Sequence, residues 1–263
     1  MRRLIAFPCA GHTLLGTLDE APGTTGLLIV SGGNEIRIGA HRGMALLARR
    51  VAEAGHPVFR FDRRGIGDST GENHGFESSA EDIAAAAATF RAETGVTRIV
   101  AFGNCDAATA LAFFHAGAGI DALLLANPWV VEQTDDLPPA AAIRSHYARK
   151  LRDPREWLRL LRGGVNIAKL FRGLTKLSQS QSKVSDGIPA RLAKALAAIQ
   201  APITILLAKG DNTAIAFADA YKAAAFDTVR ACIRIEPLDS GSHSFASATD
   251  KQWLFERILA ALA

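Results

Sequence analysis

The chain has 263 residues, 49% of them hydrophobic and 21% charged, with a formal net charge of +4 at pH 7. This composition can bury a sizeable core, and it excludes a mainly disordered or fibrous chain. No uncharged apolar run reaches the ~18 residues of a membrane span, and the first apolar run is shorter than the core of a signal peptide. Cysteines at the distant positions Cys9, Cys105 and Cys232 do not suggest a disulfide framework. We therefore expect a cytoplasmic protein with reduced thiols.

Apolar runs with the length of strands alternate with helical patterns along the chain. The first two runs, RRLIAF and HTLLGTL, predict an antiparallel hairpin at one edge of a sheet. The later apolar runs predict six more strands, at 27–31, 58–62, 98–104, 122–126, 203–208 and 232–236. Amphipathic spacing predicts helices at 42–54, 80–93, 107–116, 214–225 and 251–262. This alternation indicates a mostly parallel, eight-stranded sheet with helices on both faces.

The connection 129–200 is far longer than the roughly 2–6 residues that usually join strands and helices in such sheets. Its apolar residues, among them Trp157, Leu161 and Phe171, recur at the spacing of helices. We interpret it as a helical cap inserted into a core of residues 1–128 and 201–263. The window 144–194 carries 13 Lys and Arg residues against three acidic ones. That charge predicts either an ordinary solvated face or a peripheral contact with an anionic membrane or polymer.

The stretch RIVAFGNCDAATALAFF, residues 98–114, places a cysteine between a buried strand and an alanine-rich helix. A strand that passes abruptly into a helix is typical of a nucleophile elbow, whose usual motif is G-x-S-x-G. Here the motif reads GNCDA, with Cys105 at its centre. A cysteine after an apolar strand is more often a small buried hydrophobe. That interpretation suits Cys9 and Cys232, whereas the elbow favours Cys105 as a nucleophile.

Two further residues follow predicted strands in the order that a catalytic triad requires. A thiol nucleophile needs a base within hydrogen-bond reach and a third group that orients the base. Asp211 lies just past the strand at 203–208, and His243 lies in the Gly/Ser-rich loop after the last strand. The order nucleophile, acid, histidine predicts the triad Cys105, Asp211 and His243. Asp211 could also cap the next helix, and Asp239 is a competing acid close to His243.

An oxyanion formed at Cys105 needs two backbone N–H groups. One is expected from Asp106, at the positive end of the helix that follows the nucleophile. The second is expected from the loop SGGN after strand 27–31, where Gly33 and Asn34 are the candidate donors. The alternative is a glycine turn with a structural role only. No phosphate loop or metal-ligand spacing stands out, so we expect neither a cofactor nor a metal.

The segment HRGMALLARRVAEAGHPVFRFDRRGIGDSTGE, residues 41–72, resembles the serine-aminopeptidase and lysophospholipase branch of the α/β-hydrolases. With the SGGN loop and the cysteine elbow, it is similar to the first type of exosortase A system-associated hydrolase, which accompanies bacterial protein-sorting and exopolysaccharide machinery. The resemblance covers most of 27–119 and the loops of Asp211 and His243. It implies the α/β-hydrolase fold and a hydrolase activity, but no substrate, and it does not extend to the cap. The alternation of strands and helices by itself also allows a Rossmann-like sheet.

The chain departs from serine members of that branch by Cys105 and by Ala107, which replaces the last glycine of the elbow. Histidine and a helix N-terminus favour the thiolate, although the Asp106 carboxylate opposes it. Because a thiolate leaves easily, we expect a small acyl ester or thioester as substrate rather than a peptide, with acyl transfer as a variant. No nucleic-acid partner is expected. The alternative is a non-catalytic binding or scaffold protein with the same fold, and the oligomeric state is left open.

Overall fold

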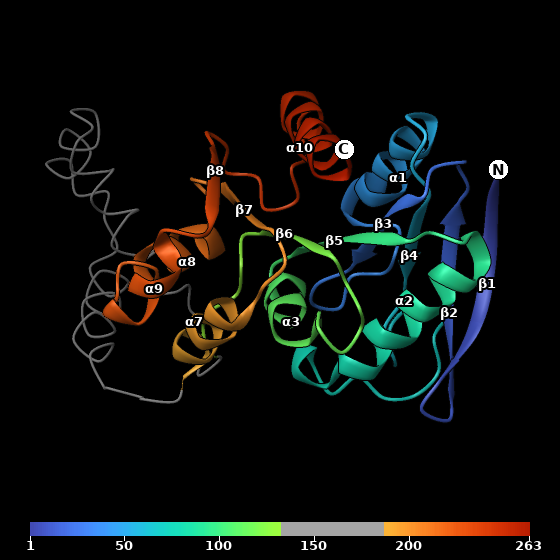
Figure 1. The fold of residues 1–263 in the computed structure, drawn as a ribbon, viewed down its shortest axis with the longest axis horizontal. Coiled ribbons are helices and arrows are strands. Elements are labelled where there is room, and N and C mark those ends of the chain that lie inside the picture. Colours follow the sequence, from blue (N-terminus) through green and yellow to red (C-terminus); the bar gives the residue numbers. More distant parts are fainter. Residues whose placement is uncertain (133–186) are drawn as a thin grey trace, which may run out of the picture.

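A single sheet of eight strands organises the computed structural model, which describes residues 1–132 and 187–263 (Figure 1). The first two neighbouring pairs of strands are antiparallel and all the other pairs are parallel. The strands lie in the order β1 (Arg2–Cys9), β2 (His12–Asp19), β4 (Val58–Phe61), β3 (Thr25–Val30), β5 (Arg98–Asn104), β6 (Ala122–Ala126), β7 (Ile203–Ala208) and β8 (Arg234–Leu238). The predicted mostly parallel, eight-stranded sheet is confirmed.

The burial of each strand follows from its place in the sheet. Strand β6 reads ALLLA, and all its residues are buried because helices cover both faces of the sheet there. Strand β1 lies at the edge, where Ile5, Phe7 and Cys9 are buried and alternate with outward-facing residues. Continuous apolar runs therefore form the centre of the sheet, and an alternating run forms its edge.

Helices cover the two faces of the sheet and enclose two apolar cores (Figure 1). On one face, α1 (Gly43–Glu53) and α10 (Ala248–Leu262) pack against each other and on the central strands. The other face carries α2 (Ala80–Thr94), α3 (Asp106–Phe114), α7 (Ile188–Ala198), α8 (Asn212–Ala220) and α9 (Asp227–Arg230). The predicted helical layers on both faces are confirmed.

Most predicted element bounds agree with the structure, and the clearest difference is at the last strand. Strand β8 begins at Arg234, two residues later than predicted, because the chain still turns after α9 at Cys232. Cys232 is therefore exposed, and its predicted role in core packing was wrong, whereas Cys9 is buried as predicted. The predicted helix 214–225 ends at Ala220, and a 3₁₀ turn (Ala224–Phe226) and α9 follow it.

Only the ends of the predicted cap, 129–200, belong to the described residues. Helix α7 falls within that range and packs on α3, with Leu192 and Leu196 in the apolar core. Trp157, Leu161, Phe171 and most of the basic window lie outside the described residues. In the part that is described, no helix has the length and apolarity to cross a membrane.

Candidate active site

The turn between β5 and α3 holds Cys105 in a backbone conformation that side chains seldom adopt. Its φ is 63° and its ψ is −128°, and such strain in a residue other than glycine is typical of functional sites. Close contact between strand and helix makes this turn possible. A Cβ on Gly103 would lie 2.8 Å from the backbone of Ala107, so the strand residue must be glycine. The thiol is therefore presented at the N-terminus of α3.

His243 lies in direct contact with Asp211. The distance from His243 Nδ1 to Asp211 Oδ2 is 3.0 Å. The same carboxylate oxygen accepts the backbone N–H groups of Thr213 and Ala214, both at 3.1 Å, and so caps α8. Asp211 thus caps a helix and contacts the histidine at once. The competing Asp239 is 96% exposed and forms an ion pair with Lys209 instead.

The protonated form of His243 is strongly favoured. Its hydrogen bond to Asp211, followed by one to Cys105, raises the pKa of His243 from 6.5 to about 10 against the opposing effect of burial. Since Nδ1 contacts Asp211, Nε2 is the nitrogen available to the thiol. The structure therefore brings Cys105, His243 and Asp211 together in one chain of interactions.

Two asparagines that the sequence analysis did not single out support the loop of His243. The backbone carbonyl of His243 accepts the side-chain N–H of Asn104 at 2.9 Å and that of Asn127 at 3.4 Å. Asn127 is fully buried, and its side-chain oxygen accepts the N–H of Ala208 at 2.9 Å. It also donates to Asn104 at 3.0 Å. The ends of β5, β6 and β7 are thereby tied to the histidine loop.

A sequence signal for Asn127 existed. A polar residue directly follows the apolar strand ALLLA and precedes a proline. Its φ is +42°, a left-handed conformation that asparagine tolerates better than most residues. A polar side chain at the carboxyl end of a parallel strand lies at the edge where ligands of such sheets bind.

The backbone N–H groups expected to bind the oxyanion differ in whether they already donate a hydrogen bond. The backbone N–H of Asp106 has no hydrogen-bond acceptor among residues 1–132 and 187–263. The N–H of Gly33, by contrast, donates to the Asp106 carboxylate at 2.6 Å. Asn34 accepts the Asn73 side-chain N–H at 2.8 Å through its own side-chain oxygen. The loop SGGN thus lies beside the elbow, with one candidate N–H already engaged.

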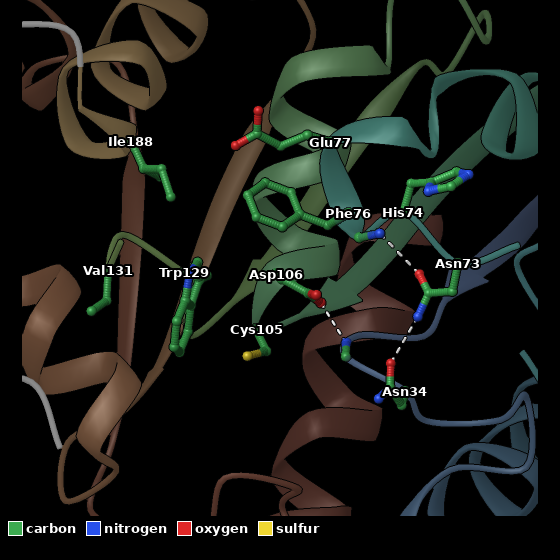
Figure 2. A pocket seen from close by; sticks show the side chains of 12 residues that line it. Asn34, Asn73, His74, Phe76, Glu77, Cys105, Asp106, Trp129, Val131 and Ile188 are labelled. Carbon is green, nitrogen blue, oxygen red and sulfur yellow. Dashed lines mark hydrogen bonds between the residues drawn. The ribbon is translucent and has the colours of Figure 1, made fainter. Parts of the chain in front are cut away.

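Cys105 opens onto a cavity of about 640 Å³ (Figure 2). One wall carries the apolar side chains of Phe76, Trp129, Val131 and Ile188, and Glu77 lies beside Phe76. The facing wall is polar and contains Asn34, Asn73 and His74. Cys105 and Asp106 lie between the two walls. The described residues contain no group of three or more His, Cys, Asp or Glu side chains placed to hold a metal ion.

A sheet of this order, with the elbow after β5 and the acid and histidine after β7 and β8, defines the α/β-hydrolase fold. The model of the alpha/beta hydrolase family matches residues 27–254, most of the chain, so the chain belongs to this family. The predicted α/β-hydrolase fold and membership of the α/β-hydrolase family are confirmed, and the Rossmann-like alternative is excluded. The resemblance to the exosortase-associated type stays a prediction. No curated protein matches the chain.

Solved structures from different organisms share this fold at low sequence identity. The esterase Pf2001 of Pyrococcus furiosus is 14% identical with a TM-score of 0.66, and the match covers 100% of this chain and 89% of that one. The alpha/beta hydrolase GrgF of Penicillium sp. sh18 is 17% identical with a TM-score of 0.65, covering 100% and 98%. A thioesterase domain from the curacin biosynthetic pathway is 14% identical with a TM-score of 0.60, covering 98% and 99%. These similarities show the fold alone.

Proposed function

We propose that the protein is a cysteine-dependent hydrolase of acyl esters or thioesters, with Cys105 as nucleophile, His243 as base and Asp211 as the orienting acid. The observation that carries the proposal is the convergence of these side chains at a strained elbow that opens onto a cavity. A nucleophile, a base and a group that holds the base are the minimum for covalent acyl transfer.

The first half-reaction forms an acyl-enzyme. The Cys105 thiolate attacks the carbonyl carbon, so that a C–S bond forms and the carbonyl electron pair moves onto oxygen. Collapse of this oxyanion breaks the bond to the leaving group, which takes the proton held by the His243 imidazolium. The Asp106 N–H, free among the described residues, is one donor to the oxyanion.

The second half-reaction needs His243 as a base, although its pKa is raised to about 10 in the free enzyme. Part of that increase comes from Cys105, and an acylated sulfur carries no negative charge. Acylation therefore lowers the proton affinity of His243 at the moment when a base is required. The neutral imidazole takes a proton from water, the hydroxide oxygen attacks the thioester, and the thiolate leaves with restoration of the ion pair.

The substrate class follows from the leaving group and from the cavity. A thiolate leaves more easily than an amine, so an amide tends to return to substrate, whereas an ester or thioester proceeds. The apolar wall of Phe76, Trp129, Val131 and Ile188 suits an acyl chain, and the polar wall suits the alcohol or thiol portion. Transfer of the acyl group to an acceptor other than water would use the same residues.

The cellular setting is also a proposal. The combination of SGGN, FDRRGIGDS and a cysteine elbow supports a role beside exosortase and exopolysaccharide machinery. The basic window 144–194 supports a peripheral contact with an anionic membrane or polymer. Both suggestions concern where the enzyme acts, and neither alters the chemistry at Cys105.

The test is a panel of acyl esters and thioesters with three variants. Cys105→Ala should lower kcat/KM by about 1,000-fold or more, because it removes the nucleophile. Cys105→Ser should keep part of the activity, since this fold normally uses serine. Cys232→Ala is the matched control, because that thiol is exposed and distant in sequence, and it should behave as wild type. Full turnover in Cys105→Ala would refute the proposal and place the chemistry at another site, whereas no turnover of any ester or thioester by wild type would favour a non-catalytic scaffold.

A further inference from the structure

The Gly33 residue beside the elbow is held from both sides by charged groups. Its N–H donates to Asp106 Oδ1 at 2.6 Å, and its carbonyl accepts Arg63 Nη2 at 2.5 Å. In Figure 2 the dashed line from the Asp106 carboxylate ends on this backbone nitrogen, next to Asn34. A carboxylate oxygen thus occupies the N–H that an oxyanion at Cys105 would use.

This occupant is a strong competitor for a substrate. A hydrogen bond from an N–H to a carboxylate is roughly twice as strong as one to a neutral carbonyl. The carbonyl oxygen of an ester is neutral until the thiolate attacks it. Gly33 therefore becomes available to the substrate only when the Asp106 side chain moves away.

Arg63 offers the displaced carboxylate a second position. Arg63 is 4% exposed, and its Nη2 lies 3.9 Å from Asp106 Oδ2. Its Nη1 is buried without a hydrogen-bond partner among the described residues, and such an unpaired donor is costly. Movement of Asp106 from Gly33 toward Arg63 would exchange one charged contact for another.

The neighbouring Gly32 leaves room for a carboxylate at this place. A Cβ on Gly32 would lie 2.8 Å from Asp106 Oδ1 and 2.5 Å from the backbone oxygen of Asn104. Any larger residue would push the loop away from the elbow. The close approach of loop and elbow therefore depends on this glycine, and the carboxylate lies directly against it.

We propose that the Asp106 carboxylate is a specificity-determining group, which occupies the Gly33 N–H until a substrate that fills the cavity displaces it onto Arg63. The inference rests on the proposed acyl transfer at Cys105. Gly33 and Asp106 line the same cavity as Trp129 and Ile188. A long acyl chain gains contacts in this cavity that offset the cost of displacing the Asp106 carboxylate, whereas a short chain does not. The binding energy of the long chain is therefore used to free the Gly33 N–H for the oxyanion.

The experiment compares nitrophenyl acetate with nitrophenyl octanoate in wild type, Asp106→Ala and Asp106→Asn. The Asp106→Ala variant keeps its backbone N–H and frees that of Gly33. Its kcat/KM for the acetate should rise roughly 10- to 100-fold, the range of one charge-assisted hydrogen bond, mainly through kcat. The ratio of octanoate to acetate kcat/KM should fall. Asp106→Asn keeps an acceptor oxygen and should give a smaller rise.

Alkylation of Cys105 by iodoacetamide separates this effect from a change in the thiolate. Alkylation displaces iodide at a saturated carbon and forms no oxyanion, so its rate reports the thiolate alone. The acetate kcat/KM divided by the alkylation rate should increase in Asp106→Ala. Asp239→Ala removes an equal charge from an exposed position and should leave this quotient at the wild-type value.

An unchanged or lower quotient in Asp106→Ala, with wild type active, would overturn the inference and leave the proposed function standing. Absence of turnover in wild type and Asp106→Ala alike, with Cys105 alkylated no faster than Cys232, would overturn both. Since Cys232 is an exposed thiol, it supplies the reference rate within the same molecule.

Discussion

His243 depends on three neighbours that come from different parts of the sequence. Asp211 binds Nδ1 at 3.0 Å and also caps α8, so a single carboxylate couples the orientation of the imidazole to the start of a helix. Asn104 and Asn127 hold the backbone carbonyl of His243 and so fix the main chain from which the ring projects. Orientation is thus set from both the side chain and the main chain.

The raised pKa of His243 predicts how stability varies with pH. Below pH 6.5 both the folded and the unfolded states hold the proton, and the stabilisation is fully present. As the pH rises toward about 10, only the folded state keeps the proton, so the free energy of unfolding falls. The imidazole is 41% exposed, and solvent screening therefore keeps the effect small.

Urea unfolding of wild type and His243→Gln at about pH 6 and about pH 9.5 tests this sign. The stability advantage of wild type should be larger at the lower pH, while titrating groups that do not interact with His243 cancel between the two proteins. An advantage that grows with rising pH would contradict the contact between the imidazolium and Asp211.

The sequence was informative about which residues meet at the site and uninformative about side-chain rotation. Cys105, Asp211 and His243 each follow a strand, and parallel strands bring their carboxyl ends to one edge, so their proximity could be predicted. The Asp106 carboxylate could turn toward solvent, Arg63 or Gly33, and only the packed structure selects among these. The support that Asn127 gives to the histidine loop could not be predicted, because it depends on which strands are neighbours in the sheet.

At the scale of elements, the contact between β5 and α3 decides where the nucleophile lies. Gly103 faces the backbone of Ala107 and the Leu111 side chain, all within 2.9 Å of where a Cβ would be. Backbone cannot yield as a flexible side chain can. A methyl group here would therefore push the helix from the strand and shift Cys105.

Gly103→Ala should lower the free energy of unfolding by about 1–3 kcal/mol, the usual cost of an overpacked core. Its effect on ester turnover should exceed that of the lost stability, because the thiol moves relative to His243. The matched control is Gly117→Ala, whose nearest neighbour to a new Cβ is 3.8 Å away. Equal stability of the two variants in urea unfolding would show that the predicted clash is absent.

Element bounds were predicted best for β5, β6 and β7, whose apolar runs are mainly buried. These three strands have the predicted limits, because residues that favour turns or solvent flank each apolar run. Strand β8 lies at the edge of the sheet, and its burial is only partial. Its polar residues Arg234 and Glu236 therefore give no clear start, which explains the shift of two residues.

For the whole molecule, the distribution of charge is more informative than its sum. The window 144–194 carries 13 basic and three acidic residues, while the complete chain is only +4. The remainder of the chain is therefore acidic overall.

We expect wild type to bind vesicles that contain an anionic phospholipid at low salt and to dissociate as salt screens the attraction. Replacement of Arg155, Arg159 and Arg162 by glutamine should weaken cosedimentation and leave hydrolysis of a small soluble ester unchanged. A control variant has glutamine at Arg49, Arg230 and Arg234, which are exposed and lie outside the basic window, and it loses the same charge. Equal binding by both variants, or none by wild type, would leave the window as an ordinary solvated face.

The two outer strands of the sheet bear on aggregation. Strand β1 carries Arg3, which is paired with Glu20 and Glu93, and Pro8 near its end. Strand β8 carries Arg234 and Pro237. Proline lacks the N–H that an added strand would need, and charged side chains resist burial against another chain. Both margins of the described sheet therefore oppose the edge-to-edge stacking of copies by which exposed strands initiate fibrils.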